Sequence, residues 1–287
     1  MNKILFAIAI LITFSFTFKN KKFKGPEGFV FIPSGTVTVD SDSKYSCAAF
    51  WMSDHEVTNK EYRDFLKSLK KSGKTGEFEN ALPDTLQWLK VEGDLDAMAN
   101  TYFWHPAYDN YPVVNISKEG VQEYCEYITQ KYRAIYGDVI QDFRLPTRME
   151  WMYAASSGKS NQIYPWGGSK LRNEKGEFLA NFRPIGDQNI TMSESGPVVV
   201  SDSLFTSELF LDGGFYTVEV QSYEPNDFGL YNMSGNVAEM VAKEDIVVGG
   251  SWYSPGYDIR IQSKKSFDGP SPFVGFRPVM SYLAPEK

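Results

Sequence analysis

Apolar residues recur at the helical period of three to four in three stretches of the chain. In the first stretch, Tyr62, Phe65, Leu66 and Leu69 fall at positions i, i+3, i+4 and i+7. Each stretch begins with a serine or threonine suited to cap a helix, twice with a glutamate three residues later, and each ends at a glycine. The pattern predicts three amphipathic helices, at 58–73, 117–137 and 147–158.

Short β-prone runs precede the first helix, at 28–33, 36–39 and 48–52. Because only Ser34 and Gly35 separate the first two runs, we expect a hairpin there. From 160 to 228 the chain has no sustained period and is rich in Gly, Asn, Asp and Ser. Long irregular stretches often depend on a metal or serve a binding role. A few helices, several short strands and much loop predict an α+β fold.

The N-terminal residues are typical of a targeting segment. Residues 4–18 are largely apolar and are followed by the basic residues Lys19, Lys21 and Lys22. The stretch is short for a membrane span of about 20 residues, so a signal peptide is favoured and an uncleaved anchor is the alternative. No cysteine follows it, which excludes a lipoprotein anchor at this position. We predict a signal peptide or N-terminal membrane anchor at 1–18, a linker at 19–27 and one domain at 28–283.

Composition narrows the class of protein. The chain has 287 residues, 15% of them aromatic, and a formal net charge of −7 with both signs interspersed. These values fit a folded domain and argue against nucleic-acid binding, which needs a clustered basic surface. The two cysteines are Cys47 and Cys125. Cys125 lies on the apolar face of the second predicted helix and is expected to be a buried free thiol, although an exported protein can pair two cysteines.

Several sequence blocks resemble those of one known family. Residues 229–239, 249–252 and 275–278 are similar to the C-terminal signature of the formylglycine-generating enzyme (sulfatase-modifying factor) family. Further blocks match in the family's order, at 33–35, 56–59, 112–114, 144–147 and 164–167. The resemblance implies the formylglycine-generating-enzyme-like variant of the C-type-lectin-like fold, which is α+β, rich in loops and has little regular secondary structure.

The residues that carry the family's oxidase chemistry differ in this chain. Founding members bind copper through two cysteines, which correspond here to Ser254 and a position near Asp258 or Ile259. Cuprous ion prefers thiolates, so hydroxyl and carboxylate groups are poor substitutes. The aromatic residue that usually precedes the motif's glutamate is replaced by Ala238. The resemblance therefore implies a member of the fold that does not generate formylglycine.

Iron chemistry is disfavoured by the histidine count. A relative that makes sulfoxides with nonheme iron needs a set of histidines, and this chain has only His55 and His105. We expect His105, between a tryptophan and a proline, to be a packed structural residue. The sequence accordingly predicts no catalytic residues, no enzyme activity, and neither copper nor iron.

The resemblance also implies calcium. In the family, one ion is held by an asparagine, two carbonyls and a glutamate, and a second by an asparagine, an apolar residue's carbonyl and an Asp-Gly-Phe segment. The matching residues are Asn232, Gly235, Val237 and Glu239 for the first site, and Asn181, Phe182, Asp212 and Phe215 for the second. Such oxygen donors suit calcium, whereas the alternative is a pair of Asn- and Asp-containing turns. The expected cofactor is one or two structural calcium ions.

A narrower resemblance comes from residues 102–114, preceded by 83–85. They are similar to a branch found in gliding-motility and type IX secretion lipoproteins of Bacteroidota, the GldK, PorK and GldJ kind. Members of that branch are periplasmic, outer-membrane-associated parts of ring or scaffold assemblies. The resemblance implies an exported, noncatalytic structural or interaction subunit that binds envelope proteins or copies of itself. Membrane contact would come through partners or through an uncleaved N-terminal segment.

Two alternative functions stay open on the sequence. One is a carbohydrate- or peptide-binding module, because this architecture often serves recognition. The other is an enzyme of unknown chemistry that uses the groove expected near Ser251 and Ser254.

Overall fold

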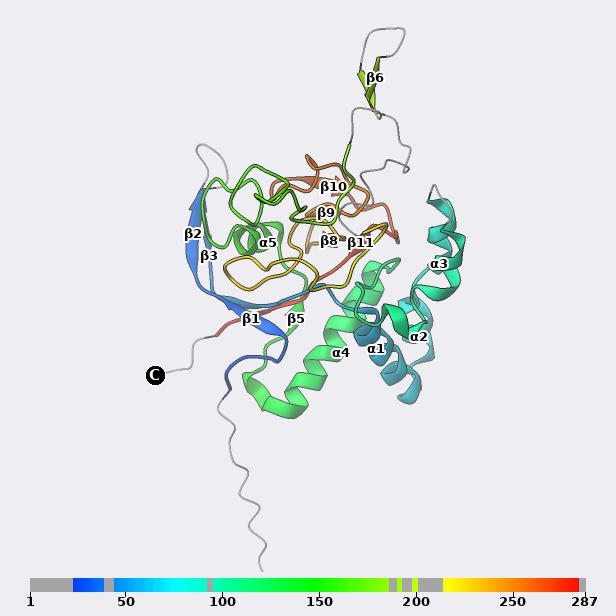
Figure 1. The fold of residues 1–287 in the computed structure, drawn as a ribbon. Coiled ribbons are helices and arrows are strands. Elements are labelled where there is room, and N and C mark those ends of the chain that lie inside the picture. Colours follow the sequence, from blue (N-terminus) through cyan, green and yellow to red (C-terminus); the bar gives the residue numbers. More distant parts are fainter. Residues whose placement is uncertain are drawn as a thin grey trace, which may run out of the picture.

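The computed structural model describes residues 23–38, 44–91, 95–185, 190–192, 198–200 and 214–283, arranged as in Figure 1. The predicted targeting segment at 1–18 and the predicted calcium ligand Asp212 lie outside the described residues. Helices and sheets are mixed, as the α+β prediction requires. In the described part of the chain, no helix has both the length and the apolar character needed to cross a membrane.

The described strands form two four-stranded and two two-stranded sheets. The first sheet has the order β1-β4-β12-β5 and is antiparallel throughout. The second has the order β10-β9-β8-β11, with β11 parallel to β8. The remaining pairs are β2-β3 and β6-β7. The strands are β1 (Phe29–Ile32), β2 (Gly35–Thr38), β3 (Lys44–Cys47), β4 (Phe50–Ser53), β5 (Phe143–Arg144), β6 (Ile190–Met192), β7 (Val198–Val200), β8 (Ala238–Met240), β9 (Ile246–Val248), β10 (Lys264–Ser266), β11 (Val274–Gly275) and β12 (Val279–Ser281).

Three of the helices were predicted from the sequence. They are α1 (Asn59–Lys71), α4 (Lys118–Tyr136) and α5 (Arg148–Ala155). The structure adds α2 (Thr75–Ala81), α3 (Asp96–Thr101) and the 3₁₀ turns η1 (Thr85–Lys90), η2 (Pro106–Tyr108) and η3 (Gly137–Val139). These elements escaped prediction because none is long enough to show a helical period of apolar residues.

Local chemistry sets where α1 and α5 begin. At α1, the backbone N–H of Thr58 donates to the Glu61 carboxylate at 2.8 Å, and the Glu61 N–H donates to the Thr58 hydroxyl at 3.2 Å. Thr147 and Glu150 form the same reciprocal pair at α5. Both capping boxes were predicted and are confirmed, because a cap depends only on residues within one turn.

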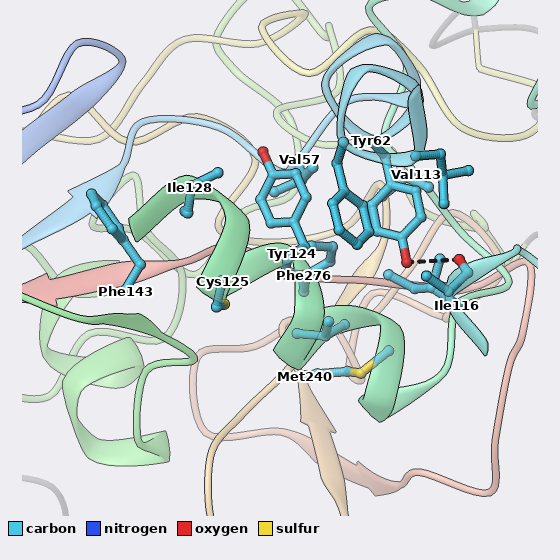
Figure 2. Packing of buried hydrophobic residues seen from close by; sticks show 14 of the residues in the cluster. Val57, Tyr62, Val113, Ile116, Tyr124, Cys125, Ile128, Phe143, Met240 and Phe276 are labelled. Carbon is cyan, nitrogen blue, oxygen red and sulfur yellow. Dashed lines mark hydrogen bonds between the residues drawn. The ribbon is translucent and has the colours of Figure 1, made fainter. Parts of the chain in front are cut away.

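Helices α1 and α4 pack through aromatic side chains (Figure 2). Tyr62 of α1 stacks on Tyr124 of α4 with ring centroids 5.7 Å apart, and Phe276 meets both rings edge-on. The Tyr62 hydroxyl donates to the carbonyl oxygen of Ala81 at 2.9 Å, which ties α2 to this core. Packing of large apolar surfaces therefore orders the helical part of the molecule.

Each face of the first sheet packs against part of the core. Ile32, Phe50 and Met52 point into a cluster with α5, which contributes the buried Trp151. Phe29 points to the opposite face, where it packs with residues of α4 and β5. Figure 1 shows α4 running along this second face of the sheet.

The predicted hairpin between 28–33 and 36–39 is wrong, although both strands exist. β1 pairs with β4, and β2 pairs with β3, so the two strands enter different sheets. In the structure, the two residues between β1 and β2 are Pro33 and Ser34, and a tight two-residue turn needs positive φ angles that Pro33 cannot adopt. Pairing with the distant β4 also buries Ile32 beside Met52, which a local hairpin does not do.

The two cysteines are both buried and free. The prediction of a buried free thiol at Cys125 is therefore confirmed. Cys47 is a buried free thiol as well. Burial raises the pKa of Cys125 to about 12 and that of Cys47 to about 11, so both thiols are protonated and unreactive at neutral pH.

Candidate functional site

A buried ionic centre joins β8, the end of β4 and the link between β11 and β12. Arg277, which is fully buried, forms an ion pair with Glu239 at 2.8 Å and lies 4.0 Å from Glu56. Its guanidinium also donates to the backbone carbonyls of Ser53 and Tyr231. Two fully buried carboxylates thus share a single guanidinium among these residues. Removing Arg277 would leave both carboxylates buried without a counter-charge.

Glu56 differs from Glu239 in its electrostatic environment. Burial raises the pKa of Glu56 to about 7, and the nearby Arg277 only partly offsets this. The amide nitrogens of Asn236 and Asn232 donate to its two oxygens at 3.0 and 3.3 Å. Glu56 was not among the predicted site residues, because its place in the block at 56–59 gives no sign that the carboxylate points inward.

Glu239, a predicted calcium ligand, is already engaged by protein donors. Arg277 donates to both carboxylate oxygens, and Trp151 donates its indole N–H to Oε2 at 2.8 Å. Its charge is therefore balanced by the guanidinium. A cation near this carboxylate would have to share an oxygen with these donors.

Asn232, the first ligand of the same predicted set, fits a cation better. It is only 8% exposed and has a positive φ of 50°. Its Oδ1 has no hydrogen-bond partner in the described part of the chain, while its nitrogen faces Glu56. A buried amide oxygen without a donor is unfavourable unless something else satisfies it. Calcium is a natural candidate for that oxygen, because it accepts amide and carbonyl ligands.

The second predicted set shows the same feature at Asn181. This residue is 1% exposed, and its amide nitrogen donates to the carbonyl of Tyr216 at 2.7 Å. Its Oδ1 has no hydrogen-bond partner among the described residues, and a Cβ at Gly214 would lie 2.7 Å from it. The structure therefore brings Asn181 beside the segment containing Phe215, whose side chain is itself half-exposed. Phe182 is buried against Phe178.

The two predicted sets are neighbours, joined through Asn236. The Asn236 N–H donates to the Asn181 carbonyl at 2.8 Å, and the Asn236 side-chain oxygen accepts from the N–H of Val218 at 2.9 Å. Gly235 has a φ of 80°, and a Cβ there would overlap the Asn181 carbonyl oxygen. Glycine is thus required where these segments meet.

The described residues hold no group of three or more His, Cys, Asp or Glu side chains placed to bind a metal. A cation in this part of the molecule would depend mainly on amide and backbone oxygens. Both predicted sets consist largely of such oxygens, beginning with the side-chain amides of Asn232 and Asn181.

A separate groove of about 250 Å³ lies beside Ser251 and Ser254. The Ser251 N–H donates to the Ser254 hydroxyl at 3.0 Å, and the two hydroxyl oxygens are 3.3 Å apart. Ala238 lines the groove, as does Lys265, which forms an ion pair with Asp258 at 2.9 Å. Its described lining contains no histidine and no cysteine. The two hydroxyls are therefore not paired with an imidazole or thiolate that would activate them.

Both histidines have other roles. His55 contacts the carboxylates of Asp54 and Glu61 at the start of α1. His105 is exposed rather than packed, and its Nδ1 accepts from the Ala107 N–H at 3.1 Å, which caps η2. The prediction that His105 is packed is therefore wrong: the residue lies on the surface and caps a 3₁₀ turn.

A family model supports the resemblance seen in the sequence. The model of the sulfatase-modifying factor enzyme 1-like domain matches residues 14–282. The formylglycine-generating enzyme of Mus musculus is 27% identical over 270 residues, covering 85% of this chain and 56% of that protein. The chain therefore spans a little over half the length of this curated relative.

For two further relatives, the match covers a larger share of the relative's own length. The inactive C-alpha-formylglycine-generating enzyme 2 of Bos taurus is 26% identical, covering 77% of this chain and 73% of that protein. The chaperone protein LppX of Paenibacillus barcinonensis is 26% identical, covering 84% and 83%.

Solved structures agree in fold. PvdO from Pseudomonas aeruginosa superposes with a TM-score of 0.55 at 18% identity, covering 88% of this chain and 94% of that one. CarF gives a TM-score of 0.54 at 17% identity, covering 89% and 98%. At these identities the likeness concerns the fold alone.

Proposed function

This chain belongs to the formylglycine-generating enzyme (sulfatase-modifying factor) family, and from that premise we propose that it is a noncatalytic structural or interaction subunit of a bacterial envelope assembly. The observation that carries the proposal is the contrast between two sites. The groove at the family's copper position offers only hydroxyl, carboxylate and ammonium groups around Ser251 and Ser254. In the buried centre, which supports the fold, Glu239 and Arg277 form an ion pair.

The assembly we favour is a gliding-motility or type IX secretion complex, with the chain exported to the periplasm and associated with the outer membrane. Support comes from the segment 102–114, where the sequence resembles that branch. Asn59 at the start of α1 donates to the carbonyls of Tyr102 and Tyr108, which fixes the segment on the domain. Trp104 projects from it half-exposed and is available to a partner protein.

We also assign the domain to a variant of the C-type-lectin-like fold. Its short strands, joined by long irregular segments, support this assignment. The similarity to an inactive relative and to a protein named as a chaperone supports a function that does not require the oxidase chemistry.

The proposal includes structural calcium. It includes neither copper nor iron. When bound, calcium would supply positive charge that gathers oxygen ligands from separate segments. Asn232, Gly235, Val237 and Glu239 would hold one ion, and Asn181, Phe182, Asp212 and Phe215 a second. The buried oxygens of Asn232 and Asn181, which lack donors among the described residues, support this assignment.

Purification from the native envelope tests the proposal. The tagged chain would be extracted in mild detergent, its partners identified by mass spectrometry and its metals by elemental analysis. We expect envelope proteins in fixed stoichiometry, with calcium and without copper or iron. A Trp104→Ser variant should lose partners, whereas Leu86→Ser, an exposed apolar residue of η1, serves as the matched control. A lone monomer that carries a redox metal would contradict the proposal.

A second candidate function is ligand binding in the groove beside Ser251. Ala238 stands where the family usually has an aromatic residue, and Tyr253 and Phe273 stack 4.9 Å apart on the lining. Mass spectrometry of the purified chain would reveal a bound peptide or saccharide. Ala238→Trp should fill the groove and expel that ligand without removing envelope partners. Unchanged ligand content in this variant would count against the groove.

A further inference from the structure

An aromatic surface lies at one end of the first sheet, and we name it the aromatic face. It consists of Phe23, Phe31, Trp51 and Tyr282, and the exposed Leu283 follows Tyr282 directly in the chain. The Phe31 ring is 5.1 Å from both the Trp51 and Tyr282 rings, so the three form one continuous cluster. Phe31 is 41% exposed and Leu283 is 64% exposed. Soluble proteins rarely leave contiguous large apolar side chains in water without a binding role.

The register of the sheet explains why this surface is uncovered. Phe31 pairs with Trp51, which pairs in turn with Met280, so these residues share one face. Helix α4 covers that face near Phe29, through contacts from Tyr132. The helix ends at Tyr136, and the face continues past it.

The chain enters the domain across the same surface. Phe23 lies between Trp51 and Tyr136, with ring centroids 6.2 and 5.3 Å away. Gly25 follows with a φ of 119°, and a Cβ there would overlap the Trp51 ring. Lys24 between them is exposed. In Figure 1 both ends of the described chain leave the domain beside the first sheet.

The sequence just before Phe23 is basic and then apolar. Lys19, Lys21 and Lys22 precede it, and residues 4–18 form the apolar stretch. The five Cα–Cα steps from residue 18 to residue 23 span at most roughly 18 Å even when fully extended. If the apolar stretch enters a bilayer, the aromatic face is therefore held close to the lipid headgroups.

We propose that the aromatic face docks on an anionic lipid surface. The aromatic rings would occupy the interfacial layer, where Trp and Tyr are favoured, and the lysines next to Phe23 would lie on anionic headgroups. The combination of an exposed aromatic cluster with an adjoining basic and apolar segment matches a bilayer surface better than a protein partner. This inference rests on the proposed envelope role for its biological setting, and it adds which face of the domain meets the membrane.

Site-directed fluorescence in the full chain tests this orientation. A polarity-sensitive probe on Leu283→Cys would be compared with one on Tyr257→Cys, which is 69% exposed on the loop between β9 and β10. Both native cysteines are buried, so they should not compete for the label. In phosphatidylglycerol-containing vesicles with spin-labelled lipid, we expect quenching at 283 to exceed that at 257 at least threefold. Equal quenching at the two positions would overturn the proposal.

Variants separate the aromatic face from the N-terminal segment. Phe31→Ser with Tyr282→Ser should reduce quenching at 283 to the level at 257, although the N-terminal segment is intact. Leu86→Ser, in the exposed part of η1, should leave it unchanged. Replacing phosphatidylglycerol by phosphatidylcholine should lower it as well, because the lysines lose their anionic partners.

Self-association is the competing outcome. If sedimentation shows a lipid-free dimer that Phe31→Ser and Tyr282→Ser dissociate, and position 283 is not quenched in vesicles, the face binds a second copy and the proposal fails. These measurements use purified protein and synthetic lipid. The vesicle experiments can therefore contradict lipid docking without bearing on the envelope assembly. That assembly is tested by the partners that co-purify.

Discussion

The helical core and the irregular segment that follows α5 are ordered by different interactions. In the core, Tyr62, Tyr124 and Phe276 fill space between α1, α4 and the sheets. In the irregular segment, asparagine side chains hold the backbone in place of sheet ladders, as Asn181 does for Tyr216 and Asn236 for Val218. Apolar packing tolerates changes in solution conditions that polar networks do not, because hydrogen bonds and charges depend on protonation and on bound ions.

The difference teaches where each region is vulnerable. The helical core should respond to loss of volume and be indifferent to metal. The polar region should respond to loss of charge balance, to chelation and to pH. The ionic centre of Glu56, Glu239 and Arg277 lies between the two regions and should be the most sensitive point.

The largest effect is expected at Arg277. Arg277→Met leaves Glu56 and Glu239 buried without a counter-charge, and should lower the free energy of unfolding by about 3–5 kcal/mol or prevent folding. Urea denaturation measures this. Arg133→Ala, which removes an exposed pair with Asp142, should cost less than about 1 kcal/mol. Similar losses in the two variants would show that the buried centre contributes no more to stability than an exposed ion pair does.

Loss of volume in the helical core should have an effect of about 3 kcal/mol. Phe65→Ala empties a fully buried position that contacts both Tyr62 and Tyr124. The same denaturation experiment, run with and without a calcium chelator, should give the same loss in both conditions. A loss that grows on chelation would mean that the two regions are coupled, which would weaken the comparison.

Calcium removal should act on the polar region alone. Chelation should lower the melting temperature of the wild type by several degrees, since a ligand at a hundred times its Kd contributes about 2.7 kcal/mol. Asn232→Ala should reduce this shift, and Asn232→Ala with Asn181→Ala should abolish it. Asn226→Ala is the matched control, because that buried side chain is satisfied by Ala154 and Leu230. A wild type indifferent to chelator would defeat the calcium assignment.

The smallest expected effect is the pH dependence at His55, at the start of α1. Burial alone would lower the pKa of His55, but hydrogen bonds to Asp54 and Glu61 outweigh it and raise the pKa to about 9. Because the folded pKa exceeds the ordinary value of 6.5, the stabilisation is fully present below pH 6.5 and is lost as pH rises through 9. The loss should be about 1–3 kcal/mol.

Denaturation of the wild type and of His55→Gln at pH 6 and pH 9.5 measures this loss. The variant should lose less stability than the wild type over the interval. Parallel pH profiles for the two proteins would assign the dependence to other groups.

Prediction from sequence succeeded where a structure depends on neighbouring residues. The capping boxes at Thr58 and Thr147, and the apolar face of α4 up to Ile128, were all predictable. Ile135 continues the same helical period but is exposed near the end of α4. Helical period alone does not show where a partner surface stops.

The candidate site was predicted only in part. Asn232 and Asn181 were named from the family resemblance, and the structure shows that each has a buried oxygen without a donor among the described residues. Glu56 was missed because its role depends on Arg277, which is more than 200 residues away in the chain. No local pattern marks a carboxylate that a distant guanidinium stabilises.

The sequence by itself determined the family, the three main helices with their caps, and the replacement of the copper cysteines. Each of these can be recognised from neighbouring residues or from motifs that follow a fixed order. Only the tertiary structure decided that β1 pairs with β4, that Glu56 and Glu239 share Arg277, and that Phe31, Trp51 and Tyr282 form one exposed surface. The physical reason is that sheet pairing and charge burial join residues far apart in the chain, and their energies depend on what the whole fold places beside them.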